Sequence, residues 1–165
     1  MNNEAIEQKT AGGASRRLQL VQAGQDQFGI FADQISAIVE WQEPAPLPHA
    51  PTSVLGVVCI QGRMLTVLDL GKLAGAEAVS ADSPRTFPRH LIALQGDEQL
   101  ALAIEGLGEV VQLTGNAPDL IDGRETVGGP VLVVWQREEA EIKILNPKGL
   151  FPTAIQGRER RQRRF

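Results

Sequence analysis

The sequence predicts an all-β protein made of two small subdomains that arose by internal duplication. The first observation is a repeat without gaps, in which Gln19–Trp41 recurs seventy-two residues later as Leu91–Leu113. Glycine, polar and apolar classes stay aligned between the copies, and Gly24, for example, corresponds to Gly96. The second is a series of short apolar runs separated by turn residues, with few helical patterns. Together they favour two fused subdomains, each a small barrel or sandwich.

Strands are expected where apolar and β-branched residues cluster. The expected strands are Leu18–Ala23, Gln27–Phe31, Ile35–Trp41, Val54–Ile60 and Met64–Leu68, then Leu91–Gln95, Gln99–Ile104, Glu109–Leu113, Val131–Gln136 and Glu141–Leu145. Gly24-Gln25-Asp26 and Gln61-Gly62-Arg63 predict tight hairpins between their flanking strands. A short helical turn is expected at Leu70–Leu73, and a closing turn at Lys148–Phe151.

Changes in composition along the chain predict its organisation. The expected segments are a disordered lead over 1–17, a domain over 18–152 and a basic tail over 153–165. Within the domain, the first barrel is mainly 18–75 and the second mainly 89–152, joined by a polar linker over 76–88.

The composition argues against several classes of function. No apolar run approaches the roughly 20 residues that span a bilayer, so no membrane insertion is expected. The formal net charge of −4 gives no general attraction to nucleic acid. Cys59 is the only cysteine, which excludes an internal disulfide and favours a reducing cytosol. The tail Arg158–Phe165 carries five arginines against one glutamate; it is expected to be a solvated terminus, with contact to an anionic surface as the alternative.

No residues have the spacing of a catalytic or metal site. The two histidines, His49 and His90, have no neighbouring cluster of cysteines or carboxylates. Asp69 and Glu105 could form an acid–base pair, but their positions after strands favour capping of short turns. Cys59 lies within an apolar strand and is expected to be a buried, inert thiol. The sequence therefore predicts no enzyme, no metal site and no cofactor.

Three stretches carry a family resemblance. They are Phe28-Gly29-Ile30 with Ile35 and Ile38, then Leu47–Pro51 leading through Val54–Gly62 into Leu65–Leu70, and finally Leu100–Leu113. These stretches resemble the CheW-like domain, the adaptor of bacterial chemotaxis signalling that also forms the regulatory end of the kinase CheA. The resemblance extends from about Leu18 to Phe151. It implies two SH3-like five-stranded β-barrels with short helical turns.

The resemblance implies a non-enzymatic scaffold that couples chemoreceptors to the histidine kinase CheA. Its expected partners are the CheW-like regulatory domain of CheA and the helical cytoplasmic tip of a chemoreceptor, held in a groove between the barrels. It implies a cytoplasmic protein that is recruited to receptor arrays. The alternative is a CheW-like binding module of another chemosensory pathway, controlling type IV pili or gliding, with a changed partner.

Six residues are candidates for partner binding. Ile35, Ala37, Gly56 and Gln61 are carried over from the family's strand and turn, and Trp41 and Trp135 are added because tryptophan is a favoured interface anchor. Each has a structural alternative. Core packing would also explain Ile35 and both tryptophans, and a positive φ would also explain Gly56.

The chain departs from the family at two of these positions. The family has a Glu at the position of Ala37 and an Arg at the position of Gln61, and these two can pair. We expect that a neutral pair has replaced an ionic one, because removing one partner alone leaves a semi-buried charge that costs about 3–5 kcal/mol. Gln61→Arg should then lower the thermal stability. An increase would contradict this hypothesis.

Overall fold

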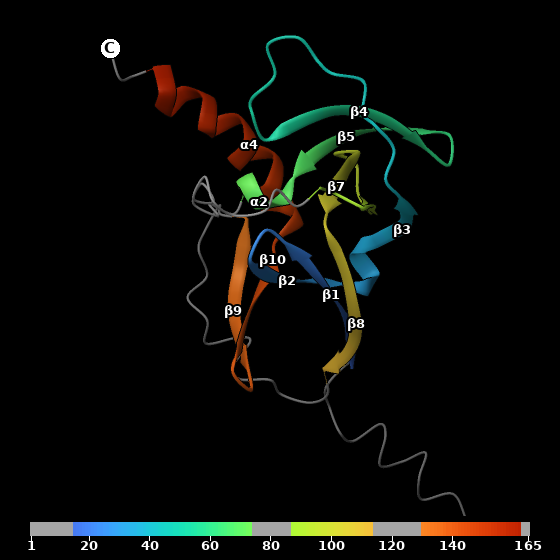
Figure 1. The fold of residues 1–165 in the computed structure, drawn as a ribbon, viewed down its shortest axis with the longest axis vertical. Coiled ribbons are helices and arrows are strands. Elements are labelled where there is room, and N and C mark those ends of the chain that lie inside the picture. The colour runs from blue at the N-terminus through green and yellow to red at the C-terminus, as the bar shows by residue number, and fades with distance from the viewer. Residues whose placement is uncertain (1–14, 74–86, 114–129, 163–165) are drawn as a thin grey trace, which may run out of the picture.

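The computed structural model describes residues 15–73, 87–113 and 130–162, with side chains as far as Ala154 in the last helix. Those residues form ten strands and three short or medium helical elements (Figure 1). Of the predicted disordered lead over 1–17, residues 1–14 lie outside this description, whereas Arg16 and Arg17 begin a strand. Residues 76–86 of the predicted linker and residues 163–165 of the predicted tail also lie outside it.

The observed elements follow the predicted order. They are β1 (Arg16–Ala23), β2 (Asp26–Phe31), the 3-10 helix η1 (Ala32–Gln34), β3 (Ile35–Glu40), β4 (Val54–Ile60), β5 (Arg63–Asp69), α2 (Leu70–Leu73), β6 (His90–Leu94), β7 (Leu100–Ile104), β8 (Gly106–Leu113), β9 (Val131–Arg137), β10 (Ala140–Leu145) and α4 (Pro147–Gln162). The predicted β4–β5 hairpin is confirmed. Gln61 and Gly62 have φ angles of 51° and 77°, as a two-residue type I′ turn requires.

The strands form two five-stranded sheets. Barrel A has the order β8-β1-β2-β10-β9, and barrel B has the order β3-β6-β7-β5-β4. Figure 1 shows barrel A in the lower part of the molecule and barrel B above it. Each barrel takes two strands from one half of the chain and three from the other. The prediction that 18–75 forms one barrel and 89–152 the other is therefore wrong.

The repeat explains this exchange of strands. Its first copy covers β1, β2 and β3, and its second covers β6, β7 and β8. In each copy the first two strands pair as a hairpin, and the third pairs with the hairpin of the other copy, so β8 lies on β1 and β3 lies on β6. The second strand of each hairpin, β2 or β7, lies at the centre of its sheet and is largely buried on both faces.

The buried apolar side chains form three clusters, one inside each barrel and one between the barrels. Inside barrel A, Leu18, Phe31 and Ile144 pack with residues of both outer strands, β8 and β9. A matching cluster fills barrel B and includes residues of β3 and β4. Because the first and last strands of each sheet share one core, each sheet curls into a barrel. The third cluster joins the barrels and includes Phe28 and Leu102, both fully buried.

The C-terminal segment differs from the prediction. A closing turn was expected at Lys148–Phe151, but these residues lie in α4. Gly149 and Pro152 are typical of a break, yet the helix continues through them. Leu150 and Ala154 are 0% and 2% exposed in the cluster between the barrels. This burial outweighs the poor helix propensity of the segment.

Candidate functional site: the exposed face of strand β8

Three of the predicted partner-binding residues lie on or just after β3. Ile35 is half-buried against the cluster between the barrels, and Ala37 and Trp41 are half-buried against the core of barrel B. Trp135 is half-buried against the core of barrel A, on the other sheet. The structure therefore does not bring the two tryptophans together, and core packing accounts for much of the surface of each.

Gly56 has a structural explanation within barrel B. Its φ is +146°, and a Cβ atom added there would overlap the carbonyl oxygen of Ala45. Ala45 forms an isolated antiparallel bridge with Val57 through two hydrogen bonds of 2.9 Å. The glycine lets the chain after β3 lie directly against β4.

The hypothesis about Ala37 and Gln61 needs a correction. Gln61 lies at the tip of the β4–β5 hairpin and is exposed. An arginine there would remain in water, so the penalty of a semi-buried charge does not apply to Gln61→Arg. The expected loss of thermal stability is not supported by this geometry. The predicted buried thiol is also wrong, since Cys59 is exposed on β4, opposite the exposed Met64.

Among the described strands, β8 is the one that carries two exposed large apolar side chains. Leu107 is 43% exposed and Val110 is 52% exposed. Strand β8 lies at the end of the barrel A sheet, next to β1. Sequence reasoning missed both residues, although the repeat carried the signal. Leu107 corresponds to the candidate Ile35, and Val110 corresponds to Ile38, which is 38% exposed on β3.

A β-bulge decides where these two side chains point. Residues three apart in a regular strand lie on opposite faces of the sheet. In the β1–β8 ladder, Val110 pairs with Gln19 and Leu107 pairs with Val21, with a register shift between them. Because Gln19 and Val21 are two residues apart on β1, Leu107 and Val110 share one face. The bulge thus joins two aliphatic side chains into one surface.

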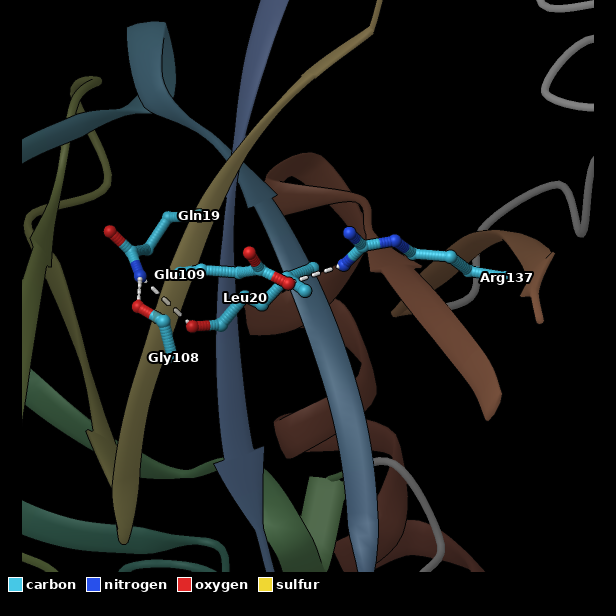
Figure 2. Close-up of polar contacts among 5 residues, drawn as sticks. All are labelled: Gln19, Leu20, Gly108, Glu109 and Arg137. Atoms are coloured by element: carbon cyan, nitrogen blue, oxygen red, sulfur yellow. Dashed lines mark hydrogen bonds and ion pairs between the residues drawn. The ribbon is translucent and has the colours of Figure 1, made fainter. Parts of the chain in front are cut away.

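A hollow lies beside this pair, and an ion pair lies on the opposite face of β8. A hollow of about 390 Å³ lies beside the bulge, lined by Leu20, Val21, Gln22, Gln27 and the β8 residues Gly106 to Glu109. Glu109 extends from β8 toward Arg137 at the end of β9, and their side chains form an ion pair of 2.6 Å (Figure 2). The ion pair connects the first and last strands of barrel A. Because neighbouring residues of a strand point to opposite faces, Glu109 lies on the other side of β8 from Val110, and the hollow with Gln22 and Gln27 is what borders the apolar pair.

A second, larger hollow lies between the barrels. It has a volume of about 570 Å³ and is formed where η1, the β6–β7 turn and the β10–α4 junction meet. Most of its lining surface is apolar, although Gln34, Gln99 and Lys148 contribute to it, and none of the six predicted residues belongs to it. A groove between the barrels therefore exists, but the residues carried over for it lie elsewhere.

The described residues offer little for chemistry. Within them, no three side chains of His, Cys, Asp or Glu gather as a metal site would require. Asp69 accepts a hydrogen bond of 3.2 Å from the backbone nitrogen of Lys72, which confirms its predicted role as a cap for α2. None of the helices described is both long and apolar enough to cross a bilayer. Fold and surface together define a two-barrel protein with an exposed apolar pair on β8.

Comparison with known proteins agrees with this description. The sequence profile of the CheW-like domain matches residues 17–153, so the chain belongs to the CheW-like domain family. It is 32% identical over 74 residues to a chemotaxis protein CheW of Rhizobium meliloti (strain 1021). That match spans 45% of this chain and 46% of the relative.

A solved structure has the same fold. The crystal structure of the scaffolding protein TtCheW from Thermoanaerobacter tengcongensis superposes with a TM-score of 0.66 at 15% identity. The superposition covers 84% of this chain and 93% of that one. The predicted fold class, two five-stranded SH3-like subdomains with few helices, is confirmed.

Proposed function

We propose that this protein is a non-enzymatic adaptor of chemotaxis signalling, which couples a chemoreceptor to the histidine kinase CheA by protein contacts alone. It acts in the cytoplasm, at receptor arrays. Membership of the CheW-like domain family supports the proposal. The observation that carries it is the shared face of Leu107 and Val110 on β8, because an apolar pair beside a hollow suits the apolar side of a helical receptor tip.

Calorimetry tests the proposal in two titrations. One uses a soluble fragment with the cytoplasmic tip of a chemoreceptor from the same cell, and the other uses the CheW-like domain of its CheA. Micromolar binding, about −8 kcal/mol, is expected for each. Val110→Asp should weaken receptor binding at least tenfold, because it places a charge in the apolar contact.

Val134→Asp is the matched control. Val134 is 44% exposed on β9, the strand at the other end of the same sheet. Equal loss in both variants would contradict the assignment of the surface to β8. Failure of the unsubstituted protein to bind either partner would contradict the adaptor function in this pathway. A CheW-like module for pilus or gliding control would then be the candidate to test.

A further inference from the structure

The bulge between β1 and β8 leaves backbone groups without regular ladder partners. The register places Gln19 opposite Val110 and Val21 opposite Leu107, so Leu20 faces two residues, Gly108 and Glu109. In such a bulge, the extra residue interrupts the pattern of hydrogen bonds between the strands. An added Cβ at Gly108 would lie 3.1 Å from the carbonyl oxygen of Leu20, which shows how closely the backbones approach.

A buried side-chain amide fills this gap. Gln19 is 6% exposed, one of only two polar side chains classed as buried among the described residues. Its Nε2 donates hydrogen bonds of 2.9 Å to the carbonyl oxygen of Leu20 and 2.8 Å to that of Gly108 (Figure 2). One nitrogen thus bridges the two strands at the irregular step. A buried amide that meets backbone groups in this way holds them firmly, since breaking the contacts would leave them unpaired.

Barrel B provides an internal comparison. Its β3–β6 ladder has a register shift at the equivalent place, between Ile35 and Ala37. In that ladder Ile92 lies opposite Ile38, the residue that corresponds to Val110, so Ile92 occupies the place that Gln19 has in barrel A. A bulge at this place therefore forms without an amide, and Gln19 adds a constraint that only barrel A has.

We infer that Gln19 is a positioning residue for partner recognition. Its amide braces the bulge and thereby holds Leu107 and Val110 together as one docking surface for the helical receptor tip. The inference rests on the proposed adaptor function. It adds that this surface is rigid before binding, so that the partner does not have to order it. Barrel B lacks the brace, which gives the two barrels different roles although they share one ancestral repeat.

The test is Gln19→Leu, which removes the amide and keeps an aliphatic side chain of similar size. The fold should persist, because Ile92 shows in barrel B that an aliphatic residue is compatible with the bulge. Binding of the receptor-tip fragment should weaken at least tenfold by calorimetry, while binding of the CheW-like domain of CheA should change less than twofold. Gln136→Leu serves as the control, because Gln136 lies on β9 of the same barrel, lines neither hollow, and its amide makes only an exposed contact of 3.2 Å to Glu141.

Hydrogen exchange of backbone amides is the second readout, and it needs no partner. Amides of β8 that face β1 should exchange at least tenfold faster in Gln19→Leu, and amides of β6 should be unchanged. Equal weakening of both partners, or unchanged exchange in β8, would overturn the inference. If the unsubstituted protein binds no receptor tip, the adaptor proposal fails, and the docking role of Gln19 fails with it. Faster exchange would then establish the brace as a purely structural device.

Discussion

Substitution of Gly56 by alanine gives the sharpest test of the structure. At φ +146°, a residue with a side chain is strained by about 1–3 kcal/mol. The new Cβ would also overlap the carbonyl oxygen of Ala45 and force it away from β4. The two hydrogen bonds between Ala45 and Val57 would then be lost, at about 0.5–1.5 kcal/mol each. The expected loss in free energy of unfolding is about 2–6 kcal/mol, summed from these two effects.

Gly24→Ala separates the two causes. Gly24 has a φ of +64°, and an added Cβ would have no neighbour within 4 Å. That variant should lose only the cost of a left-handed residue, about 1–2 kcal/mol. Urea denaturation followed by tryptophan fluorescence measures both, because Trp41 packs on the core of barrel B. If Gly56→Ala loses no more stability than Gly24→Ala, the close approach of Ala45 is refuted.

Three further substitutions test other parts of barrel A. Gly29→Ala would place a Cβ 2.7 Å from a terminal carbon of the fully buried Leu18, and this overpacking should lower the free energy of unfolding by about 1–3 kcal/mol. An unchanged midpoint of urea denaturation would refute this packing. Trp135→Ala should lower the free energy of unfolding by about 2 kcal/mol, since the side chain is only half-buried against the core of barrel A. An unchanged free energy of unfolding would show that the side chain does not pack on the core. Arg137→Gln should lower the free energy of unfolding by less than about 1 kcal/mol, because its ion pair with Glu109 is in contact with solvent, and this loss should shrink at high salt. A larger loss that does not depend on salt would contradict this reasoning.

The sequence allowed the strands and hairpins to be predicted, because alternating apolar runs and turn residues are local signals. Gln61-Gly62 is an example, since its turn geometry depends only on neighbouring residues. The exchange of strands between the barrels could not be predicted, since the apolar pattern of a strand does not determine which other strand it pairs with. The bulge beside Leu107 was missed for a similar reason. It lies between β1 and β8, which are far apart in the chain: the contact of Gln19 with Gly108 there joins residues 89 positions apart.

The candidate site was predicted only in part. Family resemblance pointed to Ile35, and the repeat would have led from there to Leu107 on the other barrel. The exposure of each depends on what packs beside it, and that is a property of the assembled sheets. Helix α4 was missed because Gly149 and Pro152 are poor helix residues, and the buried position of Leu150 was not visible from local propensity.

The interleaved sheets make the two barrels inseparable as folding units. A chain cut between β5 and β6 would leave β1 and β2 without the three strands that complete their sheet, and β3, β4 and β5 without the hairpin at the centre of theirs. Neither fragment could close a barrel alone, whereas the two together could complement each other as separate chains. For the same reason, one barrel cannot be exchanged between related proteins by joining the first half of one chain to the second half of another, because each barrel contains strands of both halves. A change of partner specificity has to arise at individual surface positions, while the duplicated halves remain joined.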